Sequence, residues 1–213
     1  MRKKIISLIM ICVFAFSLAA CGNADEKEEI NDNQNSSESV ETTEIKDKTR
    51  DEDTGKTIDT DIMENSRLVV YFSNTGNTES AAQVIAEKAG ADIAEIKRSK
   101  EYGDLQAEAE AEIQNKEYPD ISVDVENLSQ YQTIFVGYPI WFDEAPAMIA
   151  TFLAENDFSE KTIVPFCTSA GDSIDNSLHI FKELSPNAEI LEGLTVENET
   201  DIEPWLEKLG FLS

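Results

Sequence analysis

The chain has 213 residues, enough for one ordinary domain with extensions. It carries 43 Asp and Glu against 17 Lys and Arg, a formal net charge of −26 at pH 7, so repulsion by phosphates argues against nucleic acid as a partner. Three cysteines and one histidine make a disulfide scaffold or a histidine-rich metal site hard to build.

The first twenty residues have the pattern of a targeting segment. Residues 2–4 are basic, residues 5–16 are apolar, and small residues follow. The ending Leu18-Ala19-Ala20-Cys21 resembles the lipobox of bacterial lipoproteins, which implies cleavage before Cys21 and acylation of that residue. Each buried acyl methylene adds about 0.8 kcal/mol of membrane affinity. We therefore expect an extracytoplasmic protein that only a lipid anchor holds to a bacterial membrane; the alternative is an uncleaved anchor that happens to contain a cysteine.

Residues 21–65 are expected to form the acylated cysteine and a disordered acidic tether. Residues 22–65 contain no aromatic residue and no proline, and are crowded with Asp, Glu, Asn, Ser, Thr and Lys. Such a segment cannot bury enough apolar surface to offset its chain entropy. We interpret it as a spacer without a partner of its own.

From Ser66 onward, predicted strands and helices alternate. Short apolar runs predict buried strands at residues 68–72, 133–137 and 162–166. Alternation predicts a second, weaker strand at 92–96, and residues 189–194 are the candidate for a fifth strand. Apolar side chains at helical spacing predict intervening helices, with the faces Ala81, Val84, Ile85 and Ala89; Tyr102, Leu105, Ala109 and Ile113; Met148, Ile149, Phe152 and Leu153; Ile174, Leu178 and Phe181; and Ile202, Trp205, Leu206 and Leu209. The alternation predicts one α/β domain over residues 66–213, with a doubly wound five-stranded parallel sheet and helices on both faces.

Ligands of such sheets bind beyond the carboxyl ends of the strands. The first strand ends in six small polar residues, Ser73, Asn74, Thr75, Gly76, Asn77 and Thr78, directly before a predicted helix N-terminus that favours an anion. Neither Lys nor Arg occurs between residues 68 and 87, and the Gly-Lys-Ser/Thr ending of a triphosphate loop and the three glycines of a dinucleotide loop are both missing. The loop suits one terminal phosphate bound by amides and hydroxyls; the alternative is that these residues only satisfy the helix start.

Three motifs resemble a known family. Ser-x-Thr-Gly-Asn-Thr at residues 73–78 resembles the phosphate loop of flavodoxins. Gly-Tyr-Pro-Ile-Trp at 137–141 and Phe-Cys-Thr at 166–168 resemble a flavodoxin-like group at the ends of the third and fourth strands. The resemblance runs from about Arg67 to Leu212 and looks like a short-chain member. It implies the strand order 2-1-3-4-5 and bound flavin mononucleotide (FMN).

The resemblance also implies which residues would hold FMN. Its phosphate would contact the six residues of the first loop. Its ring would contact a second loop, where an indole can stack on a flat ring and exclude water, formed by Pro139, Ile140, Trp141, Phe142 and Asp143. We take Trp141 as the first choice for stacking; the alternative is that the aromatics only plug the end of the sheet. Amides of a third loop would meet the pyrimidine edge of the ring, from Cys167, Thr168, Ser169, Ala170, Gly171 and Asp172.

This chain departs from its relatives at two places. Trp-Trp-Gly often stands in related sequences where this chain has residues 141–143, and the glycine makes a peptide flip near the reduced flavin cheap because it tolerates positive φ. Asp143 therefore weakens the expectation of a strongly stabilised one-electron-reduced flavin. His-Gly-Gly often stands where residues 169–171 lie, so histidine-assisted chemistry is not expected. Because the third loop has no aromatic residue, the second flavin face is expected to be open to a small substrate.

The leading hypothesis is a membrane-tethered electron carrier that serves an unidentified redox partner protein. The alternatives are a flavin-dependent reductase of quinone or another small acceptor, and a binding module without flavin. Cys167 lacks the arginine of a cysteine phosphatase and is expected to be a half-buried structural residue, and His179 is expected at the surface or its boundary. No catalytic residue and no metal ligand is assigned.

Overall fold

The structure is a computed structural model that describes residues 66–213. The predicted signal segment, the lipidation site Cys21 and the tether lie outside the described residues. Among the described residues, no helix has the length and apolar character needed to cross a membrane.

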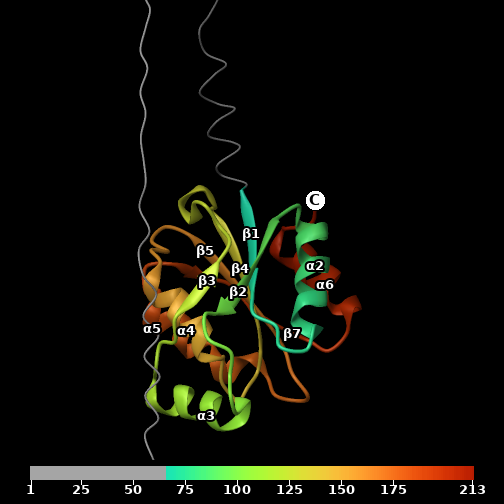
Figure 1. Cartoon of the computed structure of the whole chain (residues 1–213). Helices are drawn as coiled ribbons and strands as arrows, with labels where there is room; N and C mark the ends of the chain where they lie inside the picture. The colour runs from blue at the N-terminus through green and yellow to red at the C-terminus, as the bar shows by residue number, and fades with distance from the viewer. Residues whose placement is uncertain (1–65) are drawn as a thin grey trace, which may run out of the picture. The chain divides into compact units, whose positions relative to one another are not determined.

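A mostly parallel sheet forms the centre of the domain (Figure 1). Its order is β3-β2-β1-β4-β5-β6, and β7 also pairs with β5. The strands are β1 (Arg67–Tyr71), β2 (Asp92–Arg98), β3 (Ile121–Val123), β4 (Thr133–Pro139), β5 (Thr162–Thr168), β6 (Glu189–Ile190) and β7 (Leu194–Val196). The order of the parallel strands confirms the predicted 2-1-3-4-5 arrangement, with β6 and β7 together in the fifth place.

Helices cover both faces of this sheet, as predicted (Figure 1). They are α2 (Asn77–Ala89), α3 (Leu105–Asn115), α4 (Ala147–Glu155), α5 (His179–Leu184) and α6 (Ile202–Leu209). One apolar core lies between the sheet and α2 with α6, and includes the buried residues Val69, Ile85, Phe135, Phe166 and Leu206. The other lies on the side of α4 and α5, and includes Val70, Val136, Met148, Phe152 and Phe181. Full burial of each such large side chain contributes about 1.5–3 kcal/mol before the entropy cost.

The prediction of exactly five parallel strands was wrong in two details. First, β3 adds a short antiparallel edge strand beside β2, with Ile96 opposite Val123. Second, the predicted strand 189–194 is interrupted. Ile190 pairs with Ile163 and Leu194 pairs with Phe166, so the fifth strand has one residue more than β5 over this stretch. An extra residue in one strand is a bulge, and it breaks the ladder locally.

The predicted helix faces needed two corrections. Tyr102 precedes α3, because Asp104 caps that helix by accepting a hydrogen bond from the Ala107 N–H at 3.2 Å. Within α3, Leu105 is exposed, whereas Glu112 is buried. The predicted helix over residues 174–181 is a 3₁₀ turn at 174–177, followed by α5.

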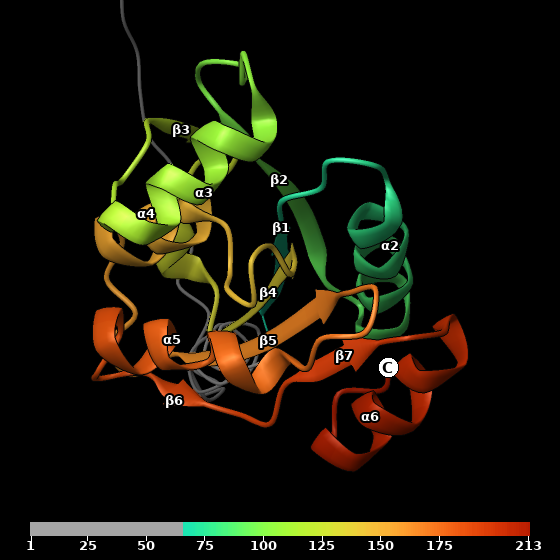
Figure 2. The same ribbon diagram turned by 90° about the horizontal axis from the view of Figure 1, so that it is seen from below.

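The three predicted loops leave the sheet at one edge, its carboxyl edge, from which Figure 2 views the domain. Backbone bonds continue beyond the ladders there: Phe72 N donates to Gly137 O, and Ile140 N donates to Thr168 O, both at 2.9 Å. These bonds place the starts of the three loops side by side.

Candidate functional site

The first loop turns into α2 through Gly76, which has φ +89° and is the N-cap residue. A residue with a Cβ would be strained at this angle. Gly76 N donates to Ser73 Oγ at 3.1 Å. The N-cap residue, being glycine, has no side chain that could accept hydrogen bonds from the first turn of α2. The N–H groups of the first turn of a 13-residue helix therefore remain for an anion.

The polar side chains of this loop divide into an exposed group and a buried one. Asn74, Thr75 and Asn77 are exposed, and Ser73 is half-buried. Thr78 is buried, and its Oγ1 lies 2.8 Å from Oγ1 of Thr168 at the end of β5. Thr78 thus ties the first loop to the start of the third, while the exposed polar residues face solvent.

The second loop is a tight hairpin turn. Trp141 and Glu144 exchange two backbone hydrogen bonds of 2.9 Å around two central residues. Both central residues have positive φ, 52° for Phe142 and 64° for Asp143, which is the conformation of a type I′ turn. Asn, Asp and Gly favour such positions, whereas Phe is an outlier there. Phe142 is also 44% exposed, so this turn presents an aromatic ring to solvent.

Trp141, which precedes this turn, lies between two other aromatic rings. The ring of Phe72 meets it edge-on, with 5.3 Å between centroids and 84° between planes. The ring of Tyr102 lies 6.2 Å away at 66°. Such edge-to-face pairs each contribute about 0.5–1.5 kcal/mol beyond area burial.

The third loop is folded around Ser169. Ser169 Oγ accepts hydrogen bonds from Gly171 N at 3.2 Å and from Asp172 N at 2.7 Å, so these two amides are already engaged. Cys167 is fully buried rather than half-buried, and its Sγ lies 3.7 Å from Thr195 Oγ1. Burial raises the pKa of the Cys167 thiol to about 11. Cys167 can therefore meet a ligand only through its main chain.

Contacts also link the second loop to the segment after the third. Asn176 Nδ2 donates to Asp143 Oδ1 at 3.4 Å. His179 Nδ1 lies 3.0 Å from Asn176 O and 3.6 Å from Glu144 Oε2, and its side chain is half-exposed as expected. Burial raises the pKa of the Glu144 carboxyl. The imidazole is thus held in a surface contact and has no nucleophile beside it among the described contacts.

A separate groove of about 120 Å³ lies between α3, α4 and α5. It is lined in part by Ile113, Tyr118, Ile180 and Leu184. Its volume is below the roughly 300–1,000 Å³ of typical small-molecule sites. None of the residues that line it belongs to the three loops, so this groove is separate from the candidate site. Within residues 66–213, no cluster of three or more His, Cys, Asp or Glu side chains could hold a metal ion.

The structure brings the predicted residues of all three loops to one edge, but sequence reasoning missed Tyr102 as a neighbour of the site. Tyr102 was interpreted as part of a helix face, and its spacing from Leu105 gave no sign of the contact with Trp141. That contact depends on long-range packing. An aromatic residue beside Gly103 and Asp104 was the available signal, because these residues mark a loop.

These features together define a doubly wound α/β protein with an uncharged anion-binding loop and an aromatic turn at the carboxyl edge of its sheet. A family model described as flavodoxin matches residues 66–209. The chain belongs to the flavodoxin family.

Solved structures agree with this assignment. A protein of Bacteroides eggerthii described as a flavoprotein is 34% identical, with a TM-score of 0.62, over 68% of this chain and 98% of its own. One from Bacteroides uniformis is 31% identical, with a TM-score of 0.61, over 67% and 97%. A flavoprotein of Lactobacillus acidophilus, solved in complex with FMN, is 24% identical with a TM-score of 0.54 over 64% and 96%, a likeness that shows the fold. Among curated proteins, none matches this chain.

Proposed function

We propose that this chain binds FMN at the carboxyl edge of its sheet and transfers electrons at the outer side of the cytoplasmic membrane, to which acylated Cys21 anchors it. Membership of the flavodoxin family and the FMN complex of the L. acidophilus protein support the cofactor. The observation that carries the proposal is the N-terminus of α2, which begins at Gly76 with φ +89° and lacks a side-chain cap among the described residues.

The residues present fit FMN by their chemistry. Main-chain amides and polar side chains of residues 73–77 would bind the phosphate, and a dianion held by oriented dipoles needs no cation. Trp141 and the exposed Phe142 would contact the ring and exclude water from it. Main-chain groups around Thr168 and Ala170 would meet the polar edge of the ring, because the amides of Gly171 and Asp172 bond to Ser169. When bound, FMN supplies one- and two-electron chemistry.

Electron transfer to a protein partner is the favoured use of this site. His179, the one histidine of the chain, contacts Asn176 and Glu144, so histidine-assisted chemistry at the ring is not favoured. Reduction of a quinone or another small acceptor is the second candidate. The lack of an aromatic residue in the third loop, residues 167–172, favours this second candidate because one face of the ring would stay open.

A comparison of FMN with riboflavin tests the phosphate cradle. We expect the full chain, purified in detergent, to quench the fluorescence of FMN and to bind riboflavin at least tenfold more weakly, because riboflavin lacks the phosphate. Gly76→Ala should weaken FMN binding, because the strained backbone turns its amides away. Gly210→Ala is the matched control, since Gly210 also caps a helix at positive φ, +77°, but at the C-terminus of α6. Equal affinity for FMN and riboflavin would refute the cradle.

Photoreduction separates the two uses of the flavin. A carrier should accumulate a lasting one-electron-reduced form in its absorption spectrum. A reductase should bleach directly by two electrons and turn over quickly with quinone. A chain that shows no FMN binding by fluorescence or by absorption would instead be a binding module that has lost its flavin.

The membrane anchor is tested at Cys21. We expect the wild-type chain in the membrane fraction of a bacterial host, with a mass that includes acyl chains on Cys21. Cys21→Ser should abolish the acylation, because the hydroxyl is not the acylated thiol. An acyl-free wild-type chain that still cofractionates with membranes would indicate the uncleaved anchor instead.

A further inference from the structure

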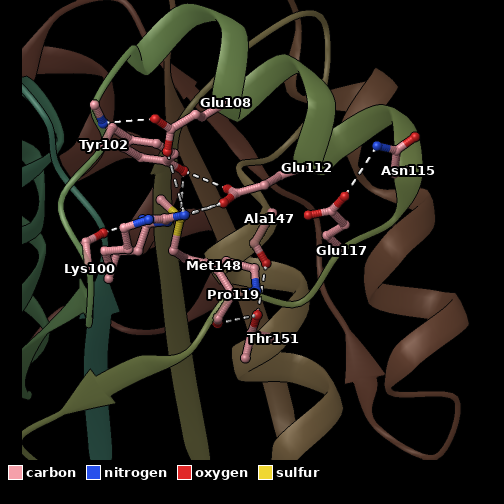
Figure 3. Close-up of polar contacts among 12 residues, drawn as sticks. Lys100, Tyr102, Glu108, Glu112, Asn115, Glu117, Pro119, Ala147, Met148 and Thr151 are labelled. Carbon is pink, nitrogen blue, oxygen red and sulfur yellow. Dashed lines mark hydrogen bonds and ion pairs between the residues drawn. The ribbon is translucent and has the colours of Figure 1, made fainter. Parts of the chain in front are cut away.

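A partly buried cluster, which we call the Tyr102 cluster, consists of Arg98, Tyr102, Glu112 and Met148. Figure 3 labels Tyr102, Glu112 and Met148 of this cluster. The cluster joins the end of β2 and the following loop to α3 and α4. Arg98 donates to Glu112 Oε1 from Nη2 at 2.6 Å and from Nε at 3.2 Å. The two side chains are only 14% and 7% exposed. A buried ion pair is costly unless further hydrogen bonds complete it.

Tyr102 completes this pair. Its hydroxyl donates to Glu112 Oε2 at 2.7 Å and lies 3.2 Å from Met148 Sδ. The guanidinium of Arg98 lies over its ring, 4.3 Å from the centroid. Burial, and then the bond to the Glu112 carboxylate, raises the pKa of the Tyr102 hydroxyl, so it stays a donor. Both the ring and the hydroxyl of Tyr102 are therefore fixed.

The backbone around Tyr102 is fixed as well. Ser99 N donates to Asp120 O at 2.8 Å at one end of the loop. At the other end, Gly103 N and Asp104 N both donate to Glu108 Oε1, at 2.9 and 3.0 Å. Figure 3 shows the contacts of Glu108 and Glu112, one helical turn apart on α3. The loop therefore holds the Tyr102 ring against the Trp141 ring, with 6.2 Å between their centroids.

We propose that Tyr102 is a positioning residue that holds the Trp141 indole in place for the flavin ring, with Arg98 and Glu112 fixing Tyr102 in turn. This inference rests on the proposed FMN site. It differs from a simple brace between β2, α3 and α4, because a brace would affect stability without affecting the indole.

The test compares three variants of the full chain by FMN affinity and thermal unfolding. Tyr102→Leu removes the ring and should weaken FMN binding about three- to tenfold, the scale of one aromatic pair. Tyr102→Phe keeps the ring but loses its hydrogen bond to Glu112, so its FMN affinity should lie between those of Tyr102→Leu and the wild-type chain. Tyr131→Phe is the matched control, because the Tyr131 hydroxyl also donates to a carboxylate, Asp92 Oδ2 at 2.6 Å, but at the opposite edge of the sheet. It should leave FMN affinity unchanged.

A double-mutant cycle shows whether Tyr102 acts through Trp141. In a Trp141→Ala background, Tyr102→Leu should change FMN affinity no further. The same loss in both backgrounds, or no loss in the wild-type background, would overturn the inference.

A readout without FMN separates this inference from the cofactor assignment. In a Trp205→Phe background, Trp141 is the only tryptophan. Tyr102→Leu should raise the acrylamide quenching constant of its fluorescence about twofold, because the indole loses one covering ring. If Tyr102→Leu does not fold, Tyr102→Phe is measured in its place. Its ring lacks the hydrogen bond to Glu112, so its quenching constant should exceed that of Tyr131→Phe. Equal quenching overturns the positioning role, whereas failure of the wild-type chain to bind FMN overturns the cofactor assignment alone.

Discussion

At the residue scale, two adjacent non-glycine residues of the second loop, Phe142 and Asp143, have positive φ. Phe142 has φ +52°, although its ring is 44% exposed and gains little from burial. A left-handed conformation costs an L-residue about 1–2 kcal/mol, and glycine escapes this cost. Strain of this kind persists where the surroundings enforce it, and here the paired backbones of Trp141 and Glu144 do so.

We therefore predict that Phe142→Gly is more stable to urea than Phe142→Ala by about 1 kcal/mol. Both variants lose the ring, so the difference reports only the backbone. The free energies of unfolding of the two proteins give the answer directly. If alanine proves as stable as glycine, position 142 does not hold a positive φ in solution.

The same turn shows how far residue-level prediction reached. Local composition predicted a polar loop before a helix N-terminus, and the structure places residues 73–78 at the start of α2. The phosphate contact of this loop stays a prediction. Asp143 has a positive φ of 64°, a conformation that Asp adopts more readily than most residues. Local sequence patterns gave no sign that Phe142 also has a positive φ. They also failed for Glu112, which is buried only because Arg98, fourteen residues away, pairs with it.

At the scale of elements, one contact between β4 and β5 links two of the sequence motifs. Gly137 pairs with Phe166, and a Cβ at position 137 would overlap the buried Phe166 ring. Glycine at the start of Gly-Tyr-Pro-Ile-Trp thus makes room for phenylalanine at the start of Phe-Cys-Thr. The second and third loops follow these residues, so the same contact sets the spacing of both loops.

We predict that Gly137→Ala lowers the free energy of unfolding by about 1–3 kcal/mol, the usual cost of overpacking. Phe166→Leu, which replaces the ring with a smaller side chain, should partly restore the stability lost in Gly137→Ala. In urea unfolding, the double variant should lose less than the sum of the single losses. Strictly additive losses would show that the ring moves aside without cost.

Element boundaries were less predictable than the elements themselves. Apolar runs identified β1, β4 and β5 because those strands are buried on both faces, whereas β2 is partly exposed and was identified by its alternation. β3 has three residues, none of them fully buried, so it lacks that signal. The bulge in the fifth strand depends on its register with β5, which no single segment encodes.

At the scale of the whole molecule, charge is the dominant property, with a formal net charge of −26. Ion pairs do little to offset it: Lys88–Glu203, Lys116–Glu183 and Lys208–Glu192 are all well exposed, and such pairs contribute about 0–1 kcal/mol each. The surplus of carboxylates therefore acts mainly on what approaches the protein. It favours a basic redox partner over an acidic one.

We predict that electron transfer from the photoreduced protein to a small basic protein acceptor slows about tenfold between about 10 mM and about 300 mM salt, because the Debye length shortens from about 30 Å to a few ångströms. A neutral quinone is the control, and its rate should stay nearly constant over the same range. Stopped-flow absorbance at the flavin bands measures both rates. Loss of the salt effect after neutralising Asp143 and Asp172 would place the steering charges at the candidate site itself, since both carboxylates are exposed beside it. A rate that rises with salt would contradict steering and would favour the small acceptor as the physiological substrate.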